Sequence, residues 1–138
     1  MSTDPATLFN TLPADALVKS AHDRIRSFPN LRLAELIYAD ERLPLADFAR
    51  GLRRQYLIII EDDGDWLCPA FQFNKRGKPL DVVKQVNKML GADQDPWGAA
   101  GWWYSSNGRI GARTPLSLLE EDPQRLLQLA RALLEPIG

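Results

Sequence analysis

The residues best suited to a functional contact are the aromatic ones in the segment WGAAGWWY, residues 97–104. Aromatic side chains at this density either fill a core or form a protein-binding patch. On a helix, Trp97 and Gly101 share a face, and the small residues between the aromatics let another helix approach closely. We expect Trp103 in the core and at least one of Trp97 and Trp102 at an interface. A purely structural role for all of them is the alternative.

A second candidate is a basic group that could contact the phosphates or base edges of DNA. Arg50, Arg53 and Arg54 lie on or just after a predicted helix, where a recognition helix would sit in a helix-turn-helix. Lys75 and Arg76 could join them if the loop that carries them folds onto the same face. Against this, the predicted wing tip holds four acidic residues that phosphate would repel. They are Glu61, Asp62, Asp63 and Asp65. Plain solvated surface charge is the alternative.

The residue types that most often perform catalysis are scarce. Cys68 is the only cysteine and His22 the only histidine, so one chain can form neither a disulfide nor a Cys/His zinc cage. Cys68 lies in an apolar run, which predicts a buried and unreactive thiol. The serines at 105 and 106 have only the distant His22 as a partner base, which gives a hydrolase triad no support.

Two further patterns favour turns over chemistry. The acidic pairs at 62–63 and 120–121 suit turn and cap positions better than acid-base work, which needs convergent groups in a tuned environment. The glycines of the segment 108–111 lack both the preceding strand and the Lys-Ser/Thr pair that a phosphate-binding loop requires. We therefore expect a protein that is not an enzyme and has neither a metal nor a cofactor.

Length and composition set the class of protein. The chain has 138 residues, of which 45% are hydrophobic, with four tryptophans, and this is enough apolar surface for a core. A formal net charge of -1 argues against a whole surface devoted to nucleic acid, so any DNA contact must be local. Because no stretch reaches the ~20 apolar residues of a membrane span and no signal peptide is evident, we expect a cytoplasmic protein.

The N-terminal half predicts helices followed by a β-hairpin. Apolar spacing indicates a helix over about 13–27, a second short helix marked by Leu33, Leu36 and Ile37, and a third that begins near Pro44. The β-branched run 56–60, a turn at 62–64 and the apolar run 66–73 then predict a hairpin. Pro69 favours an edge strand or a bulge. Helix, helix, hairpin is the order of a winged helix-turn-helix.

The C-terminal half predicts a compact set of short helices. An apolar helical face over 82–90 ends at Gly91, which is a natural C-terminal cap. Asp95-Pro96, Thr114-Pro115 and Asp122-Pro123 each place a capping side chain before a proline at the first helical position. The last helix has a broad apolar face over 126–134. The predicted fold is therefore mainly α with a small β-hairpin. It has a degenerate winged helix-turn-helix-like part at 1–73 and a helical domain at 74–138.

One region of the sequence resembles a known family. The segments DPW at 95–97, WW at 102–103 and NGRIGARTPL at 107–116, followed by a Leu-Leu pair, are similar to the toxin-binding domain of Xre/MbcA/ParS-type antitoxins. Residues 69–73 resemble the linker of members that carry a small DNA-binding module in front. The similar regions together cover about residues 66–134. Two residues depart from the family pattern, since Ser106 stands where proline is usual and Ala112 replaces a glycine.

This resemblance implies a role and a set of contacts. It implies pairing with a protein toxin, commonly an NAD-consuming toxin of the RES type, which is silenced when the antitoxin covers its active site. It also implies a homodimer and repression of the antitoxin's own operon. The implied mechanism is occlusion by an exposed turn together with the helix over 122–135. The toxin-binding residues that we infer are Trp97, Trp102, Asn107, Arg109, Gly111, Arg113 and Thr114.

Three other functions remain open from the sequence. A transcriptional regulator would use residues 31–73 as a working winged module and its C-terminal helices only for dimerisation. An adaptor on the same scaffold would bind a protein other than a toxin. A small stand-alone enzyme is the least supported of the three, because no convergent polar motif accompanies the single histidine and cysteine.

Overall fold

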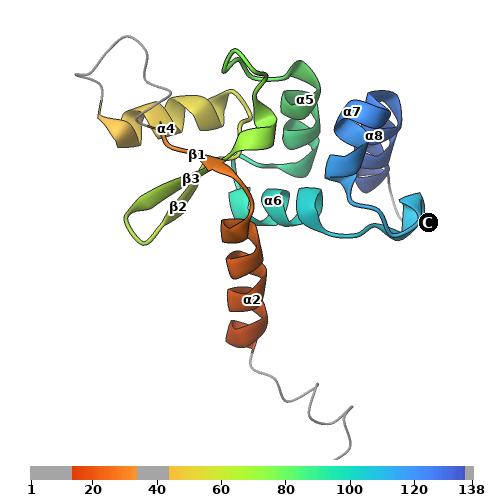
Figure 1. The fold of residues 1–138 in the computed structure, drawn as a ribbon, viewed down its shortest axis with the longest axis horizontal. Coiled ribbons are helices and arrows are strands. Elements are labelled where there is room, and N and C mark those ends of the chain that lie inside the picture. The colour runs from red at the N-terminus through yellow and green to blue at the C-terminus, as the bar shows by residue number, and fades with distance from the viewer. Residues whose placement is uncertain (1–13, 34–43, 136–138) are drawn as a thin grey trace, which may run out of the picture.

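The computed structural model describes residues 14–33 and 44–135, and it confirms a mainly α fold with a small antiparallel sheet (Figure 1). The helices and strands are α2 (Ala14–Ser27), β1 (Asn30–Leu31), α4 (Leu45–Arg54), β2 (Ile60–Asp62), β3 (Asp65–Pro69), α5 (Asp81–Leu90), α6 (Pro96–Tyr104), α7 (Leu118–Glu121) and α8 (Pro123–Arg131). Four single turns of 3₁₀ helix join them, namely η1 (Ala70–Gln72), η2 (Gly108–Ile110), η3 (Pro115–Ser117) and η4 (Ala132–Leu134).

The predicted hairpin is part of a three-stranded sheet. β2 and β3 pair antiparallel across the turn, and β1 adds to the other side of β3, which gives the order β1-β3-β2. The expectation that Pro69 lies on an edge strand or in a bulge is therefore wrong, because β3 is the central strand. Pro69 is tolerated there because it is the last residue of the strand, opposite Asn30. The predicted second strand also ends early, since residues 70–72 form η1.

The sheet region separates two apolar clusters. Ile58 and Ile60 are fully buried in the main cluster with α5, α6 and α8, whereas Ile59 between them is fully buried on the other side. Extended backbone turns successive side chains to opposite faces, so one β-branched run serves both clusters. The smaller cluster joins Ile59 and Cys68 to Ala49 of α4. Helix α4 therefore covers one face of the sheet, and α5, α6 and α8 lie against the other.

Two of the three predicted N-terminal helices lie within the described residues. Helix α2 matches the predicted range of 13–27, and α4 begins after Pro44 as expected. Of the second short helix, Leu33 alone is described, and it is buried in the smaller cluster, whereas Leu36 and Ile37 lie outside the described residues. Ile25 of α2 is buried, but Leu17 and Val18 stay 50% and 51% exposed because the N-terminal part of α2 projects from the body (Figure 1).

The three predicted capping devices are confirmed. The side chains of Asp95, Thr114 and Asp122 accept backbone N–H donors three residues further on, at 3.0, 3.3 and 3.1 Å respectively. Each satisfies a donor that the helix itself leaves free. Gly91 ends α5 with φ +68°, which is the left-handed conformation that favours glycine.

A buried hydrogen-bond network links the segment before β2 to α5 and α6. Gln72 accepts from Ile58 N at 2.6 Å and donates to Ile58 O at 3.0 Å, so it extends that segment like a strand neighbour. Asn87 donates to Tyr56 O at 2.8 Å and to Gln72 Oε1 at 3.1 Å, and it accepts from Trp103 Nε1 at 2.9 Å. Gln72 and Asn87 are both 0% exposed. Burial makes each of these bonds costly to lose.

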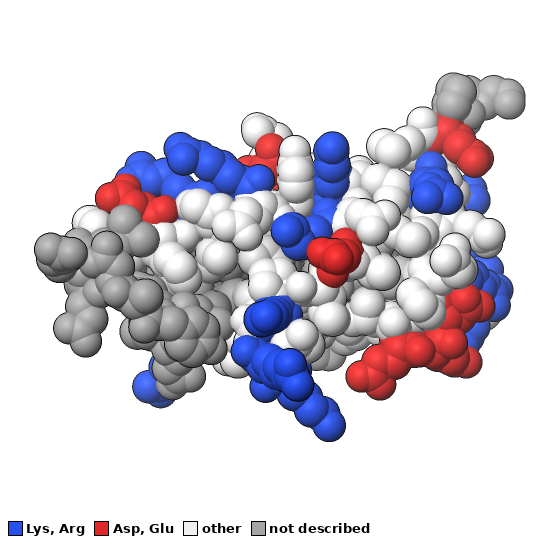
Figure 2. All heavy atoms as spheres, turned by 90° about the horizontal axis from the view of Figure 1, so that it is seen from above, with Lys and Arg blue, Asp and Glu red and all other residues white. Residues whose placement is uncertain are grey.

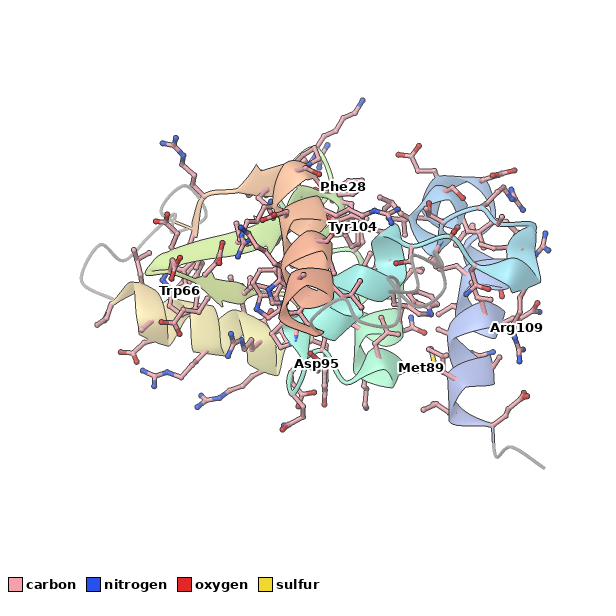
Figure 3. All side chains as sticks on the ribbon, turned by 90° about the horizontal axis from the view of Figure 1, so that it is seen from below. Phe28, Trp66, Met89, Asp95, Tyr104 and Arg109 are labelled. Carbon is pink, nitrogen blue, oxygen red and sulfur yellow. The ribbon has the colours of Figure 1, made fainter. Side chains whose placement is uncertain are left out.

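The main apolar cluster crosses residue 73, where we expect the two parts of the chain to meet. It runs from Ile25 to Ala130. Phe28 stacks on Tyr104 with ring centroids 3.8 Å apart and nearly parallel planes (Figure 3), and Arg24 donates to Tyr104 O at 2.7 Å. The N-terminal and C-terminal parts thus share one core, while their division into two domains stays a prediction.

Replacing Asn87 by Ala tests the network. We expect a loss of about 2–4 kcal/mol in the free energy of unfolding, because Trp103 Nε1, Tyr56 O and Gln72 would each lose a buried partner. Urea denaturation measures this difference. The exposed Gln94→Ala variant is the matched control and should stay within about 0.5 kcal/mol of the parent chain. A similar small effect for Asn87→Ala would contradict the importance of the network.

Candidate protein-binding surface

The bend at residues 107–113 is held by its own backbone. Asn107 N donates to Arg113 O at 2.8 Å, and Ala112 N donates to Asn107 O at 3.0 Å. The Asn107 side chain closes the loop from inside, since Oδ1 accepts from Arg109 N at 3.0 Å. An asparagine at this position thus performs a turn role that its short amide is suited to. The bend is a fixed shape that the chain presents at its surface.

Two adjacent left-handed residues give the bend its turn. Gly111 has φ +67° and Ala112 has φ +63°. Glycine adopts this conformation freely, whereas an alanine there costs about 1–2 kcal/mol. The departure of Ala112 from the family pattern therefore falls at a position that favours glycine. Ile110 is only 3% exposed and anchors the bend to the main core.

The two arginines of the bend differ in their surroundings. Arg113 donates from Nε to Ile110 O at 3.2 Å and pairs with Glu121 of α7 at 3.1 Å, so it ties the bend to the next helix. Arg109 lies exposed at the edge of the molecule (Figure 3). Within residues 14–33 and 44–135 its guanidinium makes no ion pair or hydrogen bond. Arg109 is thus available to a partner, while Arg113 has a structural role. Thr114 caps η3.

The predicted site residue Trp97 lies apart from the bend. It is at the start of α6, and the bend follows the end of that nine-residue helix, about 13 Å away. Its indole stacks on the His22 ring with centroids 3.7 Å apart, and Arg26 lies over it at 5.4 Å. Trp97 therefore fixes α2 to α6. Sequence reasoning missed this contact because periodicity predicts that α2 is a helix but does not show which element packs against it.

The other two tryptophans of α6 differ in their burial. Trp103 is fully buried, which confirms its predicted core position. Trp102 is half-buried and packs edge-on to Trp103 with centroids 5.5 Å apart. Its indole Nε1 is buried without an acceptor among the described residues. An interface role for Trp97 or Trp102 stays a prediction.

The predicted wing tip is held by an ion pair that the sequence did not reveal. Arg26 of α2 donates through Nε and one Nη to the two carboxylate oxygens of Asp62, both at 2.7 Å, and it also pairs with Asp23. This hydrogen bonding raises the pKa of Arg26 and lowers the pKa of Asp62. Asp62 therefore joins the hairpin to α2. Glu61, Asp63 and Asp65 stay exposed around it.

The predicted DNA-binding residues fall into two groups. Arg50, Arg53 and Arg54 line a hollow of about 350 Å³ beside Tyr56, together with Asp93 and Gln94. Arg53 also donates to Ile59 O at 3.0 Å, and Arg50 pairs with Asp47. Lys75 and Arg76 are exposed in the 74–79 loop and do not line this hollow. Figure 2 shows basic side chains in separate groups, with acidic and uncharged surface between them.

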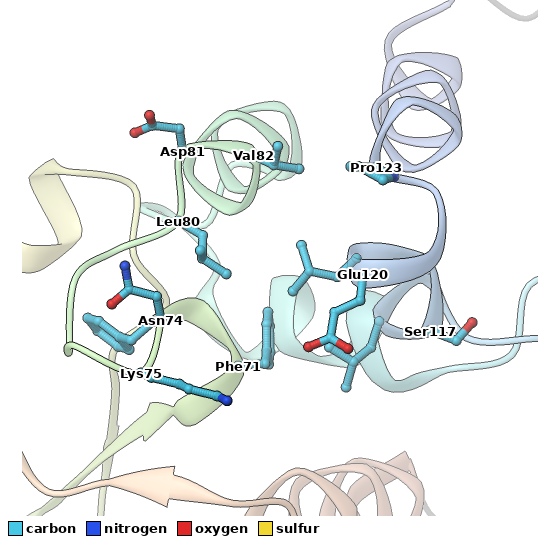
Figure 4. Close-up of a pocket in the computed structure, with 12 residues that line it drawn as sticks. Phe71, Asn74, Lys75, Leu80, Asp81, Val82, Ser117, Glu120 and Pro123 are labelled. Atoms are coloured by element: carbon cyan, nitrogen blue, oxygen red, sulfur yellow. The ribbon is translucent and has the colours of Figure 1, made fainter.

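An apolar groove of about 760 Å³ lies between η1, α5 and the η3–α8 segment (Figure 4). Its apolar lining comprises Phe71, Phe73, Leu80, Val82, Leu116, Leu119 and Pro123. Lys75 and Glu120 extend from opposite walls. The sequence places Phe71 and Phe73 in an apolar run and Val82 on an apolar helical face, and periodicity carries no sign that facing walls leave space between them. We call this feature the apolar groove.

The single cysteine, which sequence reasoning set aside from catalysis, lies inside the molecule. Cys68 is fully buried, and burial raises the pKa of its thiol to about 12. In the described part of the chain, no three His, Cys, Asp or Glu side chains gather as a metal site would require. Nor does any helix of residues 14–33 and 44–135 combine the length and apolar character needed to cross a membrane.

Comparison of the chain with protein-family models, with curated proteins and with solved structures found no significant match. The likeness to Xre/MbcA/ParS-type antitoxins thus depends on the residues of 66–134 that carry it.

The bend gives a matched pair of stability predictions. Ala112→Gly should raise the free energy of unfolding by about 0.5–1 kcal/mol, because relief of the left-handed strain exceeds the extra chain entropy of glycine. Gly111→Ala should lower the free energy of unfolding by about 1 kcal/mol through the same left-handed strain. No steric clash should add to this loss, because a Cβ at Gly111 meets no atom within 4 Å. Thermal and urea unfolding measure both. Equal signs for the two variants would rule out this account.

Proposed function

We propose that this chain is an antitoxin-like protein that binds a protein toxin and covers the toxin's active site. The observation that carries the proposal is the exposed bend of residues 107–113. Its backbone is closed by internal hydrogen bonds, it is anchored by buried Ile110, and it directs Arg109 outward. A pre-formed shape loses little conformational freedom on binding. Arginine is among the residues most often found as hot spots of protein interfaces.

The bend supports docking better than the last helix does. Leu126, Leu127, Leu129 and Ala130 of α8 are buried within the chain itself. The part of the predicted apolar face that lies on α8 is therefore already used, whereas Leu133 and Leu134, which the sequence places on the same face, lie in η4 and stay exposed. The net charge of -1 suits a specific protein partner better than general polyanion binding.

Pull-down of the product of the neighbouring gene, which we expect to be the toxin, tests the proposal. Arg109→Glu should weaken toxin binding by about 30-fold, the cost of losing one central arginine contact. Arg113→Glu alone would also break the pair with Glu121, so the charge-swapped Arg113→Glu/Glu121→Arg variant is the cleaner second probe. Arg54→Glu on α4 is the matched control and should bind as the parent chain does. Undiminished binding by Arg109→Glu would exclude the bend.

Operator binding is a second candidate function, and the N-terminal part gives a specific reason for it. A helix, a short strand, α4 and then two hairpin strands follow in chain order, with β1 beside β3, and α4 carries three arginines around one hollow. This order suits a winged helix-turn-helix with α4 as the recognition helix. The exposed acidic residues at the hairpin tip oppose phosphate contact there.

A gel-shift titration against the gene's own promoter separates the two functions. If α4 reads DNA, changing Arg50, Arg53 and Arg54 to Ala should abolish the specific complex. The non-specific binding that remains should depend less steeply on salt, because fewer phosphates are contacted. Arg109→Glu then serves as the control and should leave the shift unchanged. Absence of a specific shift with the parent chain would remove this second candidate.

A further inference from the structure

The apolar groove has walls from distant parts of the chain and charges of both signs at its rim. Phe71 and Leu80 lie on one side, and Pro123 lies on the other (Figure 4). Lys75 stands on the first side and Glu120 on the second. An apolar hollow of this size with charged edges has the form of a binding site for an apolar segment that carries charges of its own.

The same chain exposes an apolar pair that has the matching character. Leu133 and Leu134 of η4 are 53% and 63% exposed, the two most exposed of the large hydrophobic side chains in the described residues. Arg131 precedes them and Glu135 follows, and both are exposed. The segment 131–135 therefore reads basic, apolar, acidic along the chain. The groove rim carries the complementary charges, an acidic side chain at Glu120 and a basic one at Lys75.

A copy of the chain cannot fill its own groove with these leucines. Pro123 lines the groove at the first residue of α8, whereas Leu133 and Leu134 follow the last residue of the same helix. At 1.5 Å per helical residue the two features are separated by about 15 Å. They lie at opposite ends of one rigid element, so their contact requires a second molecule.

We propose that two copies of this chain form a two-fold dimer in which Leu133 and Leu134 of each copy occupy the apolar groove of the other. A two-fold axis that sets the two α8 helices antiparallel brings the C-terminal end of each to the N-terminal end of its partner. Arg131 then faces the partner's Glu120, and Glu135 faces the partner's Lys75. Two-fold symmetry makes this contact twice, so the assembly is complete as a dimer.

Two features favour a second copy over another occupant. The antiparallel arrangement sets the basic end of one α8 beside the acidic 120–122 segment of the other, so both the side-chain charges and the helix dipoles attract. It also removes from water the exposed leucine pair and the groove together. Arg109 does not line the groove, so this interface leaves the bend open and does not depend on the proposed function.

Sedimentation equilibrium of the full chain over a range of concentrations tests the dimer. The parent chain should pass from monomer to dimer, and Leu133→Glu or Leu134→Glu should weaken dimerisation by at least about 100-fold, because each change removes two leucine burials per dimer. Leu45→Glu, another exposed leucine, is the matched control and should dimerise as the parent does. Circular dichroism verifies that each variant keeps its helices.

A charge swap identifies the pairing. Arg131→Glu and Glu120→Arg should each weaken the dimer by about 10-fold, because each creates a like-charge contact. The double variant Arg131→Glu/Glu120→Arg should recover most of the loss, since opposite charges meet again. Arg54→Glu on α4, an exposed arginine that does not line the groove, is the control for a general charge effect and should leave the dimer unchanged.

A monomer at all concentrations would overturn the proposal, as would a dimer insensitive to both leucine variants or a double variant weaker than either single one. If the leucine variants instead reduce toxin capture while the parent is monomeric, the groove belongs to the toxin and the dimer is excluded. A dimer lost in Leu133→Glu, with toxin binding unaffected by Arg109→Glu, would leave this proposal standing while the proposed function fails.

Discussion

A single buried asparagine holds together the segments on which the rest of the structure depends. Asn87 of α5 bonds at the same time to the backbone before β2, to Gln72 and to the indole of Trp103 in α6. Three segments that are distant in sequence therefore have one relative arrangement that satisfies all their polar groups. An apolar side chain would fill the space but would leave the three partners unsatisfied, which is why a polar residue is the stable choice here.

The candidate binding features lie away from this hydrogen-bonded centre but are connected to it. The bend is connected to it through Ile110, and the groove through Phe71, which packs against Trp103 with ring centroids 4.8 Å apart. The projecting part of α2 and the leucine pair of η4 lie outside it and stay exposed. Burial thus separates the chain into a scaffold and a few presented surfaces. The residues of those surfaces can vary without any loss to the core.

The local features of this fold could be predicted from sequence because their causes are local. Asp95, Thr114 and Asp122 each cap a helix whose first residue is proline. The capping residue and the proline that follows it are together enough to predict where the helix begins. The short strand β1 could not be predicted, because two residues carry no periodicity and its partner β3 lies far along the chain. Pro69 was misplaced for the same reason, since its strand was taken to have a single neighbour.

The candidate surfaces show the same division. Asn107 and Gly111 fall in the turn that the family resemblance implies, where Asn107 caps η2 and Gly111 has a left-handed conformation. Trp97 was grouped with that turn, yet it packs on His22 and Arg26 at the far end of α6. The groove is formed by facing walls from residues 71–82 and 116–123. No pattern within either segment shows that the two walls leave a space between them. Long-range pairing is the information that one sequence does not carry in its periodicity.

The continuous core has a thermodynamic consequence for regulation. Because the stack of Phe28 on Tyr104 and the Asn87 bonds join the early and late segments, we expect these segments to unfold in one cooperative step. A ligand that binds only the native chain then stabilises every part of it, wherever it docks. Occupancy at one end would therefore lengthen the lifetime of the other, and protection from proteolysis would link the two ends even if neither changed shape.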